Sequence, residues 1–162
     1  MALVTAKELL LSRPPGQAVG AFNVHNMEDV QGVVWAAEEL GTPVIVMASE
    51  SALKYAGVPY IAQLVRTAAE AVSIPIALQL DHGSSFEIAK ACIECGFTSV
   101  MIDGSRLPFA ENAALTRQVV ELAHAHGVSV EAELGRVGGK EDDLEVAAQD
   151  AFLTNPDEAV EF

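Results

Sequence analysis

The sequence has few basic residues. It contains 9 Lys and Arg against 23 Asp and Glu, which gives a formal net charge of −14 at pH 7. Non-specific binding to nucleic acid requires a basic surface, so this composition argues against a nucleic-acid-binding protein. An anionic substrate stays open, because a local site can be positive within an acidic protein. We expect most of the acidity to serve solubility.

Cysteines and long apolar runs are also scarce. The 2 cysteines, Cys92 and Cys95, lie in an amphipathic helical pattern without a second Cys pair, so we interpret them as reduced thiols rather than as a redox or metal motif. Reduced thiols are typical of the cytoplasm, where we expect the protein. No apolar run approaches the ~20 residues of a membrane span. The N-terminus has no basic stretch followed by an apolar one, so no signal peptide is expected.

Aromatic residues make up only 6% of a chain that is 51% hydrophobic, and Ala and Val supply much of the rest. This composition suits buried parallel strands covered by helices with small side chains. Apolar runs predict strands at 19–24, 44–48, 75–80, 99–102 and 129–133. Periodicity and caps predict helices at 5–13, 28–40, 59–72, 84–95 and 108–126, and another helix starting near 155. Thr5 with Glu8, Asn26 and Ser84 are the expected caps of the first, second and fourth helices. Alternating elements of this kind predict a parallel sheet with helices outside.

The 162 residues form one predicted domain, but a complete eight-unit TIM barrel takes about 250 residues. Two architectures therefore remain: the first five units of a (β/α)8 barrel, or a flavodoxin-like open sheet of five strands. Residues 135–154 are rich in Gly and then acidic. We expect them to form a mobile loop at the active site.

Polar residues follow the apolar strands at the end where ligands bind in parallel α/β folds. Asp81 and His82 are the sharpest pair, because a neutral imidazole is a common metal ligand and a neighbouring carboxylate can move protons. An Asp-His-Gly turn capping the next helix is the alternative, and Asp103 has a similar alternative. Glu131 and Glu133 lie two apart, so both point to one face. The full set at strand ends is Asn23, His25, Ser49, Glu50, Asp81, His82, Asp103, Glu131 and Glu133, with Glu141 in the loop.

Lysines are absent from the predicted strand ends. Schiff-base chemistry needs a buried lysine, and Lys7, Lys54, Lys90 and Lys140 all fall in helices or loops. Metal chemistry fits better. His124 and His126 belong to a helix C-terminus, where the helix dipole favours a cation, and we interpret them as structural.

Four sequence blocks occur in order at the strand ends. They are residues 20–23 (GAFN), 78–83 (LQLDHG), 99–105 (SVMIDGS) and 130–135 (VEAELG), with 138–142 (GGKED) after them. Together they resemble the class II, metal-dependent ketose-bisphosphate aldolases, which act on fructose or tagatose bisphosphates. The resemblance covers essentially the whole chain, so we predict the first five units of a TIM barrel.

The resemblance implies reversible cleavage of a ketose 1,6-bisphosphate to dihydroxyacetone phosphate and glyceraldehyde 3-phosphate, with Zn²⁺ or another divalent metal. It also implies a homo-oligomer. Asp81 resembles the acid that protonates the aldehyde oxygen, and Glu141 resembles the base that acts on dihydroxyacetone phosphate. The other implied roles are metal binding by His82 and Glu133, substrate binding by Asn23 and Ser49, and support by Asp103 and Glu131.

The family takes its other two zinc histidines and its phosphate loops from strands six to eight. The five predicted strands supply one histidine ligand, so we expect the chain alone to bind zinc poorly. Two alternatives therefore stay open. One is an inactive half-barrel that serves as an assembly or scaffold fragment, with strands one and five as exposed edges. The other is a metal-free phosphosugar enzyme.

Overall fold

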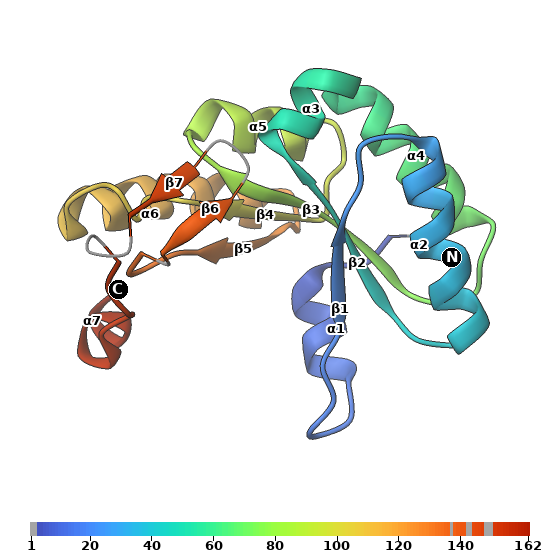
Figure 1. Ribbon diagram of the computed structural model, residues 1–162, viewed down its shortest axis with the longest axis horizontal. Coiled ribbons are helices and arrows are strands. Elements are labelled where there is room, and N and C mark those ends of the chain that lie inside the picture. The colour runs from blue at the N-terminus through green and yellow to red at the C-terminus, as the bar shows by residue number, and fades with distance from the viewer. Residues whose placement is uncertain (1–2, 137, 142–143, 148–150) are drawn as a thin grey trace.

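A computed structural model describes residues 3–136, 138–141, 144–147 and 151–162, without the side chains of 140–141 and 144–146. Five parallel strands form one sheet in the order β1-β2-β3-β4-β5 (Figure 1). A flavodoxin-like sheet would have the order 2-1-3-4-5, so that alternative is wrong. The strands are β1 (Gly20–Asn23), β2 (Val44–Ser49), β3 (Ile76–Gly83), β4 (Ser99–Ile102) and β5 (Ser129–Ala132).

Helices alternate with these strands and lie mainly on the outer side of the curved sheet (Figure 1). They are α1 (Ala6–Ser12), α2 (Met27–Leu40), α3 (Glu50–Ala56), α4 (Val58–Glu70), α5 (Phe86–Glu94), α6 (Phe109–Ala125) and α7 (Pro156–Glu161). The predicted caps are present: Thr5 and Glu8 form a capping box on α1, and Asn26 caps α2. No helix in the described ranges is long and apolar enough to cross a membrane.

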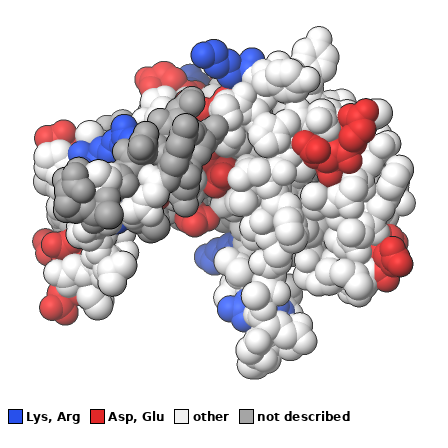
Figure 2. All heavy atoms as spheres, viewed as in Figure 1, with Lys and Arg blue, Asp and Glu red and all other residues white. Residues whose placement is uncertain are grey.

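Alternation along the strands divides the sheet into two faces. The outer face is buried against the helices through Val44, Val46, Ala48, Ile76, Leu78, Leu80, Val100 and Ile102. On the inner face, Ile45 and Ala77 form a smaller cluster with Ala6 and Leu9 of α1. The core therefore lies between sheet and helices, and the inner face is left for polar residues toward the carboxyl ends of the strands. Asp and Glu are scattered over the face seen in Figure 2, in keeping with the net charge of −14.

Three local predictions were wrong. Helix α3 begins directly after β2, where a loop was expected, because the Ser49 hydroxyl caps it. Strand β3 runs to Gly83 instead of ending at residue 80, so Asp81 and His82 lie within the strand, and the alternative of an Asp-His-Gly turn is wrong as well. Ser85, not Ser84, caps α5 by accepting the Ile88 N–H. The segment 135–154, which we expected to be a mobile loop at the active site, contains the antiparallel strands β6 (Gly139–Glu141) and β7 (Leu144–Val146). Its mobility stays a prediction.

The two cysteines are free thiols on and beside α5, as expected. Cys92 lies in the core with none of its surface exposed, and Cys95 is partly buried at the helix end. Burial, with smaller contributions from Cys95 and Glu50, raises the pKa of the Cys92 thiol to about 12. The folded chain therefore keeps this proton at a pH at which the unfolded chain has lost it.

Because of Cys92, the free energy of unfolding should fall as the pH rises. Because the raised pKa belongs to the folded state, the stability that Cys92 contributes is fully present below the unfolded pKa near 9. It is lost progressively as the pH rises from there toward the folded pKa of about 12. We expect the free energy of unfolding of the wild type to decrease more steeply than that of Cys92→Ala, by up to about 1.4 kcal/mol per pH unit. Urea unfolding of both proteins between pH 8 and 10.5 measures this, and parallel curves would contradict it.

Candidate functional site

The inner face brings Asn23 and Asp81 together at the carboxyl ends of β1 and β3. The Asn23 Nδ2 donates a hydrogen bond of 2.8 Å to Asp81 Oδ2, so the amide reaches across the intervening strand β2. The Asp81 side chain is 16% exposed. The amide orients one carboxylate oxygen. The other oxygen, Oδ1, lies 4.0 Å from the His82 Nε2. Asp81 and His82, which the sequence analysis singled out as a pair, thus lie side by side at this end of the sheet.

His82 has an unusual backbone conformation. Its φ of 48° is left-handed, which non-glycine residues adopt rarely and usually at a cost. The pairing of β3 with β4 also shifts register between Leu80 and Gly83. Neighbouring residues of a regular strand point to opposite faces. The distortion at His82 breaks this alternation, so that its ring and Asp81 serve the same site.

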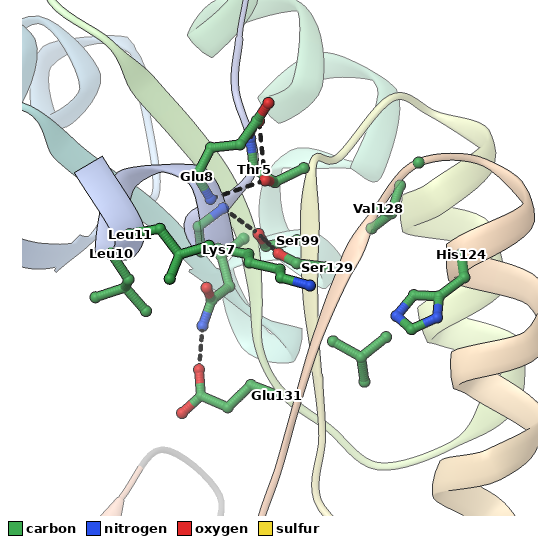
Figure 3. A pocket seen from close by; sticks show the side chains of 14 residues that line it. Thr5, Lys7, Glu8, Leu10, Leu11, Ser99, His124, Val128, Ser129 and Glu131 are labelled. Carbon is green, nitrogen blue, oxygen red and sulfur yellow. Dashed lines mark hydrogen bonds between the residues drawn. The ribbon is translucent and has the colours of Figure 1, made fainter.

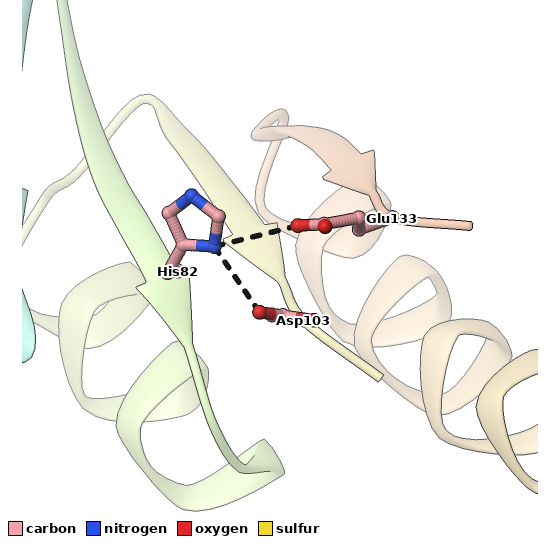
Figure 4. Close-up of side chains that lie close together, drawn as sticks. All are labelled: His82, Asp103 and Glu133. Atoms are coloured by element: carbon pink, nitrogen blue, oxygen red, sulfur yellow. Dashed lines mark hydrogen bonds and ion pairs between the residues drawn. The ribbon is translucent and has the colours of Figure 1, made fainter. Parts of the chain in front are cut away.

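The His82 ring meets two carboxylates that lie just beyond β4 and β5 (Figure 4). Its Nδ1 lies 3.1 Å from Asp103 Oδ2 and 3.4 Å from Glu133 Oε2. Side-chain exposure is 26% for His82, 8% for Asp103 and 20% for Glu133. The cluster is therefore largely, but not completely, screened from bulk water.

Electrostatics within the cluster favour a positive charge between the carboxylates. The hydrogen bond with Asp103 raises the pKa of His82 to about 9, against the opposing effect of burial and with help from nearby Asp81 and Glu133. Burial opposes ionisation of Asp103, but hydrogen bonds from His82 and Ser105 outweigh it and hold the pKa of Asp103 at about 2. The protonated His82 ring thus balances the negative charge of the carboxylates, which a bound cation would also balance.

The donor set fits a divalent metal. His82, Asp103 and Glu133 each offer one ligand atom, and these atoms lie within 4.8 Å of one another. Three protein ligands are usual for catalytic zinc, and an imidazole with two carboxylates also suits other divalent ions. Asp103, which the resemblance gave only a supporting role, therefore belongs with the two predicted ligands. Glu131 does not, because it accepts a 2.7 Å hydrogen bond from Gln79 elsewhere on the inner face.

The other predicted residues have different surroundings. Ser49 is 7% exposed, and its hydroxyl accepts the Ala52 N–H at the start of α3 and contacts Ser51. The Glu141 backbone belongs to β6, and its side chain lies outside the described residues. His25 is exposed and bonds Asp29. The substrate roles of Asn23 and Ser49 and the catalytic role of Glu141 stay predictions.

Two contacts around the cluster had not been foreseen. The Glu50 Oε1 accepts the Ser84 N–H at 2.5 Å and holds the chain just beyond His82. The Asn112 Nδ2 donates to the Glu133 carbonyl at 2.8 Å. Glu50 was visible as a polar residue after a strand, although no role was assigned to it. Nothing in the sequence pointed to a role for Asn112, since a polar residue within a helix usually lies on the surface.

A hollow of about 870 Å³ lies on the inner face near the amino ends of β4 and β5 (Figure 3). Lys7 and Leu11 of α1 line it, with Ser99, Ser129 and Glu131 of the strands. Ligand sites of barrel enzymes form at the opposite, carboxyl end of the strands. The His82 cluster is therefore the better candidate for chemistry, and α1 covers part of the other end.

Five sequential β/α units with candidate ligands at the carboxyl ends of the strands define a barrel of the TIM type. The chain belongs to the family described as Fructose-bisphosphate aldolase class-II, whose family model matches residues 5–162. The resemblance and the predicted partial barrel are thereby confirmed.

Relatives with curated names support this membership. A fructose-bisphosphate aldolase from Geobacillus stearothermophilus is 50% identical, with 99% of this chain and 57% of the relative covered. A D-tagatose-1,6-bisphosphate aldolase subunit from Klebsiella oxytoca is 45% identical, with 100% of this chain and 57% of the relative covered. The chain thus spans little more than half the length of these relatives.

Solved structures share the fold. The crystal structure of a candidate fructose-1,6-bisphosphate aldolase from Coccidioides immitis superposes with a TM-score of 0.87 at 35% identity, covering 97% of this chain and 56% of that one. The YdjI aldolase from Escherichia coli K12 gives a TM-score of 0.75 at 33% identity, covering 89% and 50%. The described strands therefore correspond to about half of such a barrel.

Removing a ligand from the cluster should weaken metal binding. We expect Asp103→Asn and Glu133→Gln each to lower the affinity for Co²⁺ by about 100-fold or more, since changes even to groups behind a ligand cost 10–100-fold. Glu131→Gln is the matched control, because it removes a carboxylate from the same strand outside the cluster. Competition with a chelating dye measures all three. An equal loss in Glu131→Gln would contradict the assignment.

Proposed function

We propose that this chain supplies the first five units of a site for reversible aldol cleavage of a ketose 1,6-bisphosphate, with dihydroxyacetone phosphate and glyceraldehyde 3-phosphate as products. The observation that carries the proposal is the junction of Asp81 and His82. A proton-transfer group and a candidate metal ligand adjoin at one strand end, and Asp103 and Glu133 face the ligand. The names of the fructose and tagatose aldolase relatives point to the same reaction.

The chemistry assigns distinct tasks to the residues. Breaking a carbon–carbon bond beside a ketone leaves an enediolate, and a divalent metal bound at the site would supply Lewis-acid stabilisation of that charge. We propose Zn²⁺ as this metal, with His82, Asp103 and Glu133 as the residues of this chain that would hold it. These side chains are preorganised by strands β3, β4 and β5, which lowers the cost of assembling them.

Asp81 is the proposed proton-transfer group at the hydroxyl of the breaking bond. In cleavage it takes the hydroxyl proton, and in condensation it returns the proton to the aldehyde oxygen. The Asn23 amide, bonded to one carboxylate oxygen, leaves the other directed toward the His82 side of the site. Glu141, in the loop after β5, is the proposed base for the carbon of dihydroxyacetone phosphate. Asn23 and Ser49 are the proposed substrate contacts.

A second candidate function is a half-barrel that serves assembly rather than catalysis. In the described sheet β1 pairs with β2 alone and β5 pairs with β4 alone, so both outer strands present unpaired backbone groups. We propose that the protein forms a homo-oligomer in either case. Sedimentation with a parallel metal titration separates the two functions: a discrete oligomer that binds no divalent metal favours assembly.

Asp81→Asn should separate two steps of the reaction. We expect cleavage of fructose or tagatose 1,6-bisphosphate to fall about 10²–10⁴-fold, since a positioned acid–base group contributes that much. Exchange of the dihydroxyacetone phosphate proton with deuterated water should persist, because it depends on the other base. Glu141→Gln should abolish this exchange. Coupled NADH oxidation and proton NMR measure the two steps.

Both assays would use this chain alone and a fusion that adds the remaining length of the Geobacillus stearothermophilus relative. Thorough chelation should stop both steps, and added Zn²⁺ should restore them. Activity that survives chelation would favour the metal-free phosphosugar enzyme instead. Unchanged cleavage by Asp81→Asn would remove Asp81 from the mechanism.

A further inference from the structure

Asn112 is a buried amide in the interior of α6. It is only 2% exposed, and a buried amide is costly unless its hydrogen bonds are made. Its Nδ2 donates to the Glu133 carbonyl at 2.8 Å, and its Oδ1 accepts from the Thr116 hydroxyl at 3.3 Å. Through this bond, α6 contacts the backbone of Glu133, a candidate metal ligand.

The same side chain also contacts the segment of a second ligand. A Cβ on Gly104 would lie 2.1 Å from Asn112 Oδ1 and 2.6 Å from its Cγ. The φ of Gly104 is outside the left-handed range, so its conformation does not demand glycine. Glycine is needed here because Asn112 packs against the backbone, one residue beyond Asp103.

Strand pairing ends just before both ligands. The last pair of the β4–β5 ladder joins Ile102 to Ala132, so Asp103 and Glu133 are each one residue beyond it. In the described part of the chain, the β4–β5 ladder therefore stops short of both carboxylates. Asn112 contacts both segments at this point, with a hydrogen bond on one side and close packing on the other.

We propose that Asn112 is a positioning residue that sets the separation of the Asp103 and Glu133 carboxylates opposite His82. The inference rests on the proposed metal site, which it deepens by naming what holds two of its ligands in register. Asn112 is not one of the candidate metal ligands. Its effect passes through the Glu133 backbone and the backbone after Asp103.

The first test compares two changes within one buried cluster. Asn112→Leu keeps a similar volume and removes both hydrogen-bonding functions. Thr116→Val removes only the hydroxyl that bonds Asn112 and leaves the bond to Glu133 in place. We expect Asn112→Leu to lower Co²⁺ affinity about 10–100-fold and to alter the visible spectrum of bound Co²⁺. Thr116→Val should lower the melting temperature but keep the wild-type affinity and spectrum.

A double-mutant cycle covers the case in which Asn112→Leu does not fold. Gly104→Ala alone should push the Asn112 amide aside and weaken Co²⁺ binding. In an Asn112→Ala background the added methyl group has room, so Gly104→Ala should have little further effect. Coupled effects of this kind indicate direct contact. Additive losses would contradict the proposed link through Asn112.

Metal-free protein separates this inference from the proposed function. In NMR spectra of the wild type, we expect a scalar coupling between the Asn112 side-chain nitrogen and the Glu133 carbonyl carbon. The coupling should vanish in Asn112→Leu, with shifts in the backbone amides of residues 103–105 and 132–134. If the wild type binds no metal but shows these signals, the metal site is wrong and the positioning contact stands. If Asn112→Leu binds Co²⁺ with wild-type affinity and spectrum, the inference is overturned.

Discussion

The hydrogen bond between His82 and Asp103 is the interaction around which the site is arranged. It requires His82 to leave regular strand geometry, and a left-handed residue of this kind costs about 1–3 kcal/mol. Two hydrogen bonds to the backbone that follows His82 stabilise this conformation. The Asp103 N–H donates to the Gly83 carbonyl at 2.9 Å, and Glu50 accepts the Ser84 N–H. A side chain at Gly83 would come within 2.9 Å of the Met101 carbonyl, which explains the glycine that follows His82.

Three carboxylate-bearing segments on the inner face have an amide partner, whereas Asp103 is bonded by His82 and Ser105. Asn23 bonds Asp81, Gln79 bonds Glu131, and Asn112 bonds the backbone of Glu133. Acidic groups on a partly covered face repel one another unless donors stand between them. In the described part of the chain, no buried side-chain nitrogen or oxygen lacks a hydrogen-bond partner. This pairing lets an acidic protein keep several carboxylates close together without losing the fold.

The two faces of the sheet have different roles: the outer face is buried in the main core, and the inner face carries the candidate site. The outer face holds the main apolar core against the helices, and α1 covers the inner face only at the amino ends of the strands. The candidate site therefore lies apart from the main apolar core. The chain spans little more than half the length of its curated relatives.

The sequence by itself determined the elements, because apolar periodicity and capping depend on neighbours within a few residues. It predicted the five strands, the caps at Thr5 and Asn26, and the polar strand ends that include Asp81. It missed α3, since a seven-residue helix directly after a strand has little periodicity of its own. It placed Asp81 and His82 next to each other but could not show that both face one site.

Only the tertiary structure decided the cluster. His82 and Asp103 are 21 residues apart in the chain, and they meet because β3 is distorted at His82 and pairs with β4. Asn112 reaches Glu133 because α6 packs against β5, which no local pattern encodes. The kinds of residues follow from local chemistry. Their grouping follows from strand register and helix packing, which depend on contacts between distant parts of the chain.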